Sequence, residues 1–215
     1  MIGKIDINGL TQVLPVFPLP GAIVLPNGNL PLNIFEPRYI SMIESVLGSH
    51  RMIGMVQPYK KKNDKDSLYP VGCAAKITSF SETSDNRYLI ELKGVIRFKI
   101  IKELTVTNGF RNIQPDWITF SKDLSLNFEK VDILSLLNQL KLYFKNNNIS
   151  VDFSEISKIS NEQIIAAVPQ ICSFTPVEKQ AILEAQSEQD ILEVLISLLK
   201  MNLLGDNEES DQTIN

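Results

Sequence analysis

The spacing of apolar residues changes near Ser121, and this change constrains the fold more than any other feature of the sequence. Before it, short apolar runs are interrupted by glycine and proline, as in residues 13–21, which is typical of strands and turns. After it, apolar residues recur at helical spacing, as at Ile133, Leu137 and Phe144. The sequence therefore predicts an α+β chain with a β-rich first half and a helical second half.

The two patterns divide the 215 residues into three expected parts. Many short strands with glycine and proline turns indicate a small β-barrel, here over residues 1–120, with one helix near 37–47. A helical domain is expected over residues 121–204. Gly205 is expected to end its last helix, and the acidic residues 205–215 are expected to form a disordered tail because they are too polar to pack.

Several residues predict where individual helices begin and end. Pro37 favours a helix start because its ring fixes φ near the helical value, and Gly48 favours the end of that helix. Asp152, Ser160 and Thr175 each precede a Glu or Gln by three positions. In this spacing the two side chains can satisfy free backbone N–H groups at a helix start.

A net charge of −4 argues against a general nucleic-acid binder. The basic residues cluster once, within an expected loop over residues 59–67 that contains Lys60, Lys61, Lys62 and Lys65. Asp64 and Asp66 partly neutralise this cluster, which favours a solvated loop over a phosphate-binding site. Under the alternative interpretation, Lys60, Lys61 and Lys62 would contact phosphate.

The two cysteines, Cys73 and Cys172, lie in different halves of the chain and do not make a disulfide framework. We expect them to be reduced and partly buried. Residues 1–10 lack the apolar core of a secretory signal, and no segment approaches the roughly 20 apolar residues that span a bilayer. These features predict a cytoplasmic protein that does not insert into a membrane.

No residue pattern in the chain indicates catalysis. His50 is the single histidine and lies at an expected helix-to-strand turn, where a structural or solvated role is more common. Cys73 lies in a strand-like run without a nearby base. Phosphate-binding loops, nucleophile elbows and metal-ligand spacings are absent, and Ser–Lys pairs fall on no recognisable frame. We therefore expect no catalytic residue, no metal and no cofactor.

Ordered motifs resemble the Lon protease N-terminal domain, also called the Lon substrate-binding domain. The opening motifs are residues 14–19 (LPVFPL), 24–26 (VLP) and 30–39 (LPLNIFEPRY). Three further motifs keep the order of the family: residues 71–75 (VGCAA), 94–98 (GVIRF) and 174–184 (FTPVEKQAILE). The resemblance covers roughly residues 10–204, and the Phe-Glu-Pro-Arg-Tyr element is similar to that of free-standing members.

This resemblance implies a PUA-like mixed β-barrel followed by an α-helical bundle. In the full protease the domain helps to capture unfolded or damaged proteins, and ATPase and Ser–Lys peptidase modules follow it. With the sequence ending at Asn215, neither module is expected here. The leading hypothesis is therefore a non-catalytic module that binds unfolded or partner polypeptides.

Four residues of the shared motifs are candidates for a peptide or partner contact: Glu36, Arg38, Tyr39 and Arg97. A charge pair that joins the helix to the barrel is the favoured explanation for the three charged residues. Arg38 and Tyr39 are the first surface candidates, since arginine and aromatic residues are enriched in binding hot spots. A chaperone-like surface should also expose a contiguous apolar patch.

Two other functions stay open at the level of the sequence. PUA-like barrels also occur in RNA-modifying proteins, so RNA or nucleotide binding through the lysine cluster is the main alternative. A hydrolase with an unrecognised site is the second, and sustained ATPase or casein-degrading activity would reveal it.

Overall fold

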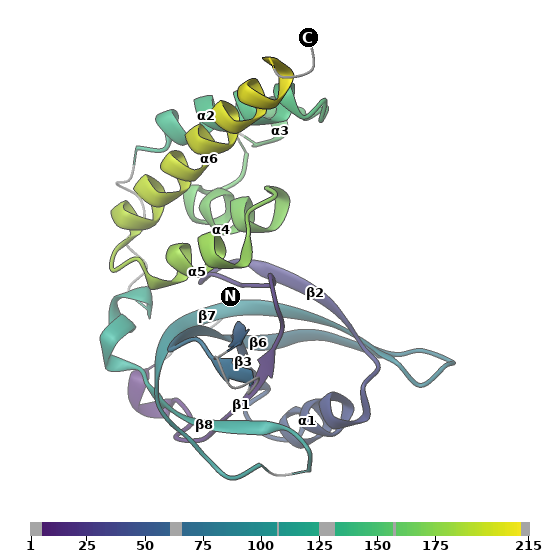
Figure 1. The fold of residues 1–215 in the computed structure, drawn as a ribbon. Helices are drawn as coiled ribbons and strands as arrows, with labels where there is room; N and C mark the ends of the chain where they lie inside the picture. The colour runs from purple at the N-terminus through teal and green to yellow at the C-terminus, as the bar shows by residue number, and fades with distance from the viewer. Residues whose placement is uncertain (1–5, 61–65, 107, 125–131, 157, 212–215) are drawn as a thin grey trace.

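A computed structural model describes residues 6–60, 66–106, 108–124, 132–156 and 158–211. Its first half is built from strands and its second half from helices, as Figure 1 shows. The strands are β1 (Leu14–Pro18), β2 (Asn29–Ile34), β3 (Met52–Val56), β4 (Pro58–Lys60), β5 (Asp66–Leu68), β6 (Val71–Glu82), β7 (Tyr88–Glu103) and β8 (Arg111–Asp116). The helices are the short η1 (Ile7–Gly9) and η2 (Ile118–Leu124) and the longer α1 (Pro37–Leu47), α2 (Leu134–Asn146), α3 (Phe153–Ile156), α4 (Asn161–Ile171), α5 (Pro176–Glu184) and α6 (Glu188–Asp211).

Six strands form one mixed sheet in the order β2-β7-β6-β3-β1-β8. β8 also pairs with β7, so that β7, β6, β3, β1 and β8 close into a ring, while β2 lies outside it against β7. β1 runs parallel to β3 and antiparallel to β8. The long strand β7 pairs with β8 inside the ring and with β2 outside it. Its first residues form a hairpin with the end of β6 that projects from the sheet (Figure 1). The chain is therefore mixed α/β with a large sheet.

Helix α1 begins at Pro37 and is followed by Gly48, which confirms the predicted helix and both of its limits. Pro37 occupies the first turn, where a missing N–H costs nothing. The buried face of the helix carries Tyr39, Met42, Ile43 and Val46. These side chains join the main hydrophobic cluster and hold α1 against the sheet.

Two glycines mark close backbone contacts inside the sheet. A Cβ atom on Gly94 would lie 2.0 Å from the carbonyl oxygen of Leu25, and one on Gly72 would lie 2.5 Å from that of Met55. Real Cβ atoms do not approach backbone oxygens so closely. Both positions therefore require glycine, because a side chain would collide with the neighbouring backbone.

Two of the three predicted helix caps form with the expected partners. The hydroxyl of Thr175 accepts from the N–H of Glu178, whose carboxylate accepts in turn from the N–H of Thr175, a complete capping box. Ser160 Oγ accepts from the N–H of Gln163. Asp152 instead accepts from the N–H of Ser154 at 2.8 Å, because a carboxylate can close a tighter turn two residues on.

Two local expectations are wrong. Residues 58–60 and 66–68 pair as the two-stranded sheet β4–β5, where a loop over 59–67 was expected; the rings of Tyr59 and Tyr69, 5.0 Å apart, support this pairing. Lys61, Lys62 and Lys65 lie outside the described residues. Helix α6 continues through Gly205 to Asp211, because one glycine weakens a helix by only about 1 kcal/mol. Of the expected tail, residues 212–215 lie outside the described residues.

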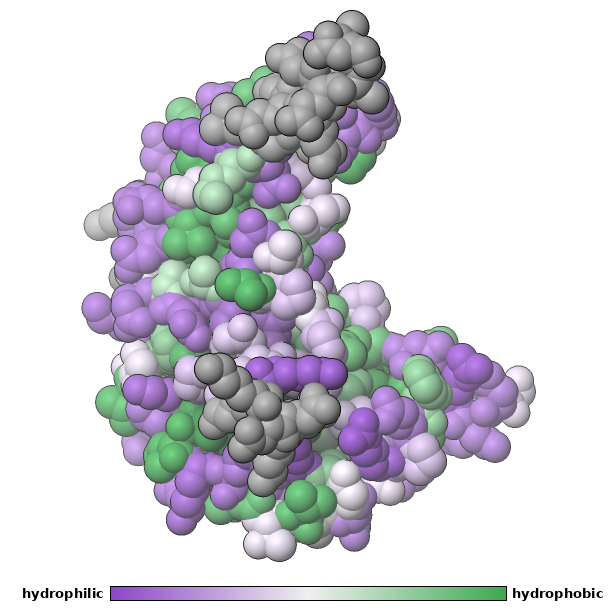
Figure 2. Space-filling view, in the orientation of Figure 1, coloured by the Kyte–Doolittle hydropathy of each residue, from purple (hydrophilic) through white to green (hydrophobic). Residues whose placement is uncertain are grey.

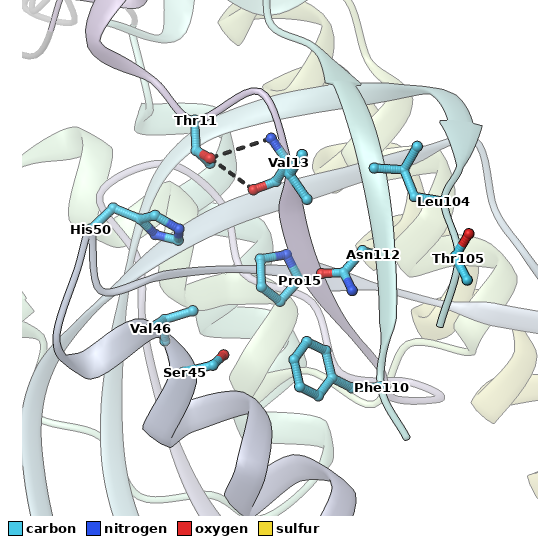
Figure 3. Close-up of a pocket in the computed structure, with 10 residues that line it drawn as sticks. All are labelled: Thr11, Val13, Pro15, Ser45, Val46, His50, Leu104, Thr105, Phe110 and Asn112. Carbon is cyan, nitrogen blue, oxygen red and sulfur yellow. Dashed lines mark hydrogen bonds between the residues drawn. The ribbon is translucent and has the colours of Figure 1, made fainter. Parts of the chain in front are cut away.

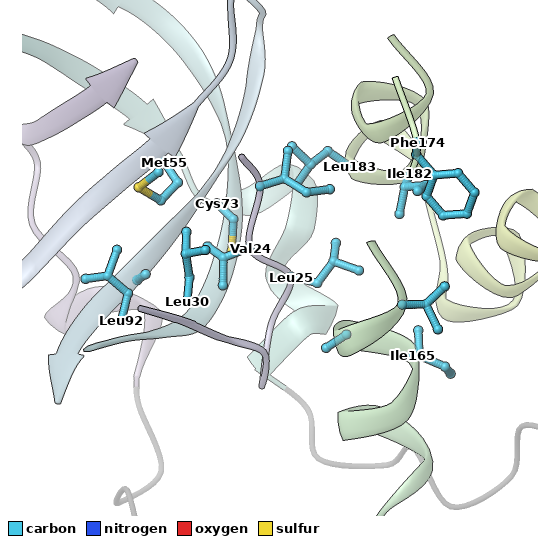
Figure 4. Packing of buried hydrophobic residues seen from close by; sticks show 14 of the residues in the cluster. Val24, Leu25, Leu30, Met55, Cys73, Leu92, Ile165, Phe174, Ile182 and Leu183 are labelled. Atoms are coloured by element: carbon cyan, nitrogen blue, oxygen red, sulfur yellow. The ribbon is translucent and has the colours of Figure 1, made fainter. Parts of the chain in front are cut away.

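One hydrophobic cluster extends through both halves of the chain. It includes Val24 and Leu25 from the loop before β2, together with Ile165 on α4 and Ile182 and Leu183 on α5. Figure 4 shows these side chains meeting between the sheet and the helices. The two halves are therefore packed together through a shared apolar core.

A buried amide pair adds polar contacts to this junction. Gln57 at the end of β3 and Gln180 on α5 are almost fully buried. Gln57 Nε2 donates to the carbonyl of Pro176 at 2.8 Å and to Gln180 Oε1 at 3.2 Å. Gln180 Nε2 donates to the carbonyl of Val71 at 3.1 Å. Because these bonds are directional, they fix the orientation of α5 on the sheet as well as its contact.

Arg97 on β7 makes a second set of polar contacts at this junction. The residue is 2% exposed. Its Nε and Nη2 donate to the two carboxylate oxygens of Asp123 on η2, at 3.0 and 2.8 Å. Its Nη1 donates to the carbonyls of Leu183 and Ala185 at the end of α5. The guanidinium also lies 4.4 Å from the centre of the Phe120 ring. A single side chain thus joins β7, η2 and α5.

The Arg97→Met variant tests this junction. It should lower the free energy of unfolding by about 3–5 kcal/mol, because the Asp123 carboxylate would stay buried without its counter-charge. Urea titration followed by circular dichroism measures the change.

The double variant Arg97→Met/Asp123→Leu is the control and should regain part of the loss, since neither charge remains buried. Arg87→Met, in the exposed pair of Arg87 with Asp85, should change stability little. A single Arg97→Met variant as stable as the wild type would contradict this account.

Candidate functional site

Two of the predicted site residues, Arg38 and Tyr39, line a surface hollow of about 200 Å³. They lie in the first turn of α1, which Pro37 places beside the end of β1. Tyr39 is buried against Phe17, with ring centres 4.1 Å apart, while the Arg38 side chain is 53% exposed. The remaining walls are Pro18, Pro20, Pro58, Gly109, Phe110 and Arg111. The hollow thus combines arginine, aromatic and proline side chains.

The charges at this hollow are paired at the surface. Arg38 Nη2 lies 2.8 Å from Glu36 Oε2, and the Arg38 guanidinium lies 4.5 Å from the centre of the Tyr39 ring. Arg111 pairs with Glu103 at 2.5 Å. Burial raises the pKa of the Tyr39 phenol above its ordinary value, so this ring is uncharged at neutral pH. Glu36, Arg38 and Tyr39 are therefore brought together.

Arg97 is not part of this group. Its guanidinium is buried at the junction of sheet and helices and is bonded to Asp123, Leu183 and Ala185. The favoured explanation from the sequence is a charge pair that joins the helix over residues 37–47 to the strands; Arg97 is charge-paired, but its partner is Asp123 on η2 and not a residue of α1. A direct peptide contact would require the guanidinium to leave these partners. Lys60, the described member of the lysine cluster, is exposed at the end of β4.

A second and larger hollow, of about 550 Å³, was not predicted from the sequence. It lies where the second half of α1, the start of β1 and the chain around β8 meet (Figure 3). Phe110 lines both hollows, so they adjoin at this ring. The apolar walls of the second hollow are Val13, Pro15, Val46, Leu104 and Phe110. Because these residues are distant in sequence, no local motif could have indicated the site.

His50 lies at the edge of the second hollow, which gives the single histidine a location that its turn position did not indicate. Its Nδ1 accepts a hydrogen bond from the N–H of Met52 at 3.0 Å. Burial lowers the pKa of the imidazole below its ordinary value, so His50 is neutral at pH 7. With Nδ1 as acceptor, the proton of the neutral ring is on Nε2.

Other features of the surface bear on which kinds of site are present. Among the described residues, no three His, Cys, Asp or Glu side chains come together to hold a metal ion. No helix within the described ranges combines the length and apolar content needed to cross a bilayer. The face seen in Figure 2 mixes hydrophobic and polar side chains, without one continuous apolar area.

Two solved structures with a similar fold are Lon N-terminal domains. The chain resembles the Lon N-terminal domain protein from Xanthomonas campestris with a TM-score of 0.59 and 18% identity, covering 87% of this chain and 98% of that one. The N-terminal domain of the Mycobacterium avium complex Lon protease gives a TM-score of 0.62 and 16% identity, covering 88% and 98%. These similarities define the class of fold.

The family follows from the sequence itself. Residues 13–201 match the family model of the ATP-dependent protease La (LON) substrate-binding domain. The match extends over most of the chain, and the chain belongs to this family. The resemblance seen in the motifs is therefore confirmed, and the matched region is the substrate-binding domain of the protease, not its catalytic domain.

Relatives of the chain include full-length Lon proteases. The Elusimicrobium minutum Lon protease is 26% identical over 207 residues, which are 91% of this chain and 24% of that protein. Lon protease 2 of Myxococcus xanthus is 26% identical over 103 residues, 46% of this chain and 12% of that protein. The chain thus matches between an eighth and a quarter of the length of these relatives.

Thiol labelling tests whether either cysteine belongs to a reactive site. Cys73 and Cys172 are both buried, and burial raises the pKa of Cys172 to about 12 and raises that of Cys73 as well. Because the thiolate is the reactive form, neither should react with a disulfide reagent at about pH 8 in the folded protein. Both should react in denaturant. Rapid labelling of the folded chain would show that a thiol is accessible and activated.

Proposed function

We propose that the chain is a polypeptide-binding module without a catalytic centre of its own, and that the Arg38–Tyr39 hollow contacts the bound polypeptide. Membership of the substrate-binding family supports the class of ligand. The single observation that carries the location is the hollow itself, where an exposed arginine lies over a tyrosine among three prolines. Arginine and aromatic side chains supply much of the binding energy in protein interfaces.

The ion pair between Glu36 and Arg38 is weak enough for Arg38 to bind a carboxylate of a ligand in place of Glu36. Both side chains are close to half exposed, and an exposed ion pair contributes little free energy. A carboxylate on a bound polypeptide can therefore replace Glu36 at small cost. The planar guanidinium can bind such a carboxylate with two parallel hydrogen bonds.

The finer features of the fold and setting form part of the same proposal. The ring of five strands supports a PUA-like β-barrel over residues 1–120, and the helices that follow support an α-helical bundle over residues 121–204. Two buried cysteines without a disulfide support a reducing, cytoplasmic setting.

The Arg38→Ala variant tests the location of binding. It should weaken binding of a permanently unfolded protein, reduced and carboxymethylated α-lactalbumin, by about tenfold, because a hot-spot arginine contributes about 1–2 kcal/mol. Fluorescence anisotropy of the labelled α-lactalbumin measures the affinity. The melting temperature should stay near that of the wild type, because the lost ion pair is exposed.

Arg87→Ala is the matched control. Arg87 is exposed to a similar extent, pairs with Asp85 two residues away at 2.8 Å, and also lies over an aromatic ring, that of Phe35. It lines neither hollow and should bind as the wild type does. Equal affinities for the Arg38→Ala and Arg87→Ala variants would reject the location, and absence of binding by the wild type would reject the function.

A further inference from the structure

Asn112 is the unusual residue of the larger hollow. It lies on β8, is 7% exposed, and points into the space between Pro15 and Phe110 in Figure 3. Within the described parts of the chain, its side-chain amide has no hydrogen-bond partner. Every fully enclosed polar side-chain atom of the described residues does have a partner. The Asn112 amide therefore faces the open space of the pocket rather than the packed core.

The other polar groups of the pocket are mostly engaged. The hydroxyl of Thr11 donates to the carbonyl of Val13 at 2.7 Å, and that of Ser45 donates to the carbonyl of Met42 at 2.7 Å. His50 uses Nδ1 to accept from Met52, which leaves its Nε2–H toward the pocket. The Asn112 amide and the His50 Nε2–H are thus polar groups that a ligand can meet, beside the hydroxyl of Thr105, which also lines the pocket.

The position of Asn112 is fixed by its backbone. Asn112 is opposite Pro15 in the register of β1 and β8, and its carbonyl accepts from the N–H of Leu104 at 2.8 Å. These contacts hold the backbone of Asn112 next to Pro15 and Leu104, which are two of the apolar walls. The backbone at this position is therefore ordered before a ligand binds, which lowers the entropy cost of binding.

The chemistry of the walls selects an uncharged ligand. No Lys, Arg, Asp or Glu side chain is among the ten residues that line the pocket, and His50 is neutral. A charged group bound there would find no counter-charge among these residues. The volume of about 550 Å³ is within the range that accepts a large side chain together with its backbone.

We propose that this pocket binds an uncharged, apolar residue of an extended polypeptide and that Asn112 recognises the peptide group of that residue. A side-chain amide offers one acceptor and two donor positions, so it can pair with the N–H and C=O of a peptide backbone. Phe110 also lines the Arg38 hollow, so the two proposed contacts lie on either side of one residue. This proposal rests on the polypeptide-binding function given above and names the residue class that it prefers.

Nuclear magnetic resonance with small probes tests the pocket by itself. N-acetyl-phenylalanine N-methylamide carries one apolar side chain and two peptide groups. It should shift the side-chain NH₂ resonances of Asn112 in the ¹⁵N-labelled protein until they saturate. The aspartate analogue should bind much more weakly because of its charge. Ethylbenzene, which has no amide, should bind more weakly than the phenylalanine probe, so its shifts of the Asn112 NH₂ resonances should saturate only at higher concentration.

The Asn112→Leu variant removes the amide and keeps nearly the same volume. It should be at least as stable as the wild type to heat, because the amide has no partner in the folded chain, yet bind the phenylalanine probe about tenfold more weakly, equal to about 1.4 kcal/mol. Ser45→Trp is a second variant that fills the pocket from an exposed position of α1. Ser135→Trp, at an exposed position of α2 outside the pocket, is its matched control and should bind normally.

The outcomes separate this proposal from the function on which it rests. If unfolded α-lactalbumin binds to the wild type and equally to the Asn112→Leu and Ser45→Trp variants, the pocket proposal is overturned and the module function stands. If the phenylalanine probe shifts Asn112 but α-lactalbumin does not bind, the pocket stands and the module function fails. Equal responses to ethylbenzene and the phenylalanine probe would reduce the site to an apolar cavity and overturn the role of Asn112.

Discussion

The buried pair of Arg97 and Asp123 joins three segments that are distant along the chain and that also share the apolar core. Arg97 belongs to the sheet, Asp123 to the short helix that follows it, and the carbonyls of Leu183 and Ala185 to the end of α5. In a site from which water is excluded, each of these groups would be costly if left alone. Because all of them are satisfied only in one arrangement, the pair specifies how the helical half sits on the sheet.

The hollows depend on a second constraint, the closure of the sheet. β8 bonds to β1 along one edge and to β7 along the other, and the resulting ring brings the chain around Phe110 and Asn112 beside α1. Had β8 paired with β1 alone, this segment would be free to move away from the helix. The same closure therefore supplies stability to the sheet and walls to both hollows.

The two hollows differ in chemistry although they share the ring of Phe110. One presents Arg38 among prolines beside a buried tyrosine, and the other presents Asn112 among apolar walls. Under the function proposed above, they would together give an extended polypeptide a charged contact, an apolar contact and a partner for its backbone. A module of that proposed kind would accept many sequences, because backbone groups are common to all of them.

The sequence alone determined the features that arise from neighbouring residues. Pro37 and Gly48 set the limits of α1, Thr175 and Glu178 form their capping box, and the motifs from residue 14 to residue 184 identify the family. These effects act over a few residues, so they can be read without the fold.

Only the tertiary structure decided which distant residues meet. It buried Arg97, which the motif alone left as a candidate for peptide binding, and it brought Pro15, Ser45 and Asn112 to one pocket. The physical reason is that strand pairing and the burial of charge depend on partners far along the chain. Their free energy is realised only when the sheet closes and the helices pack against it.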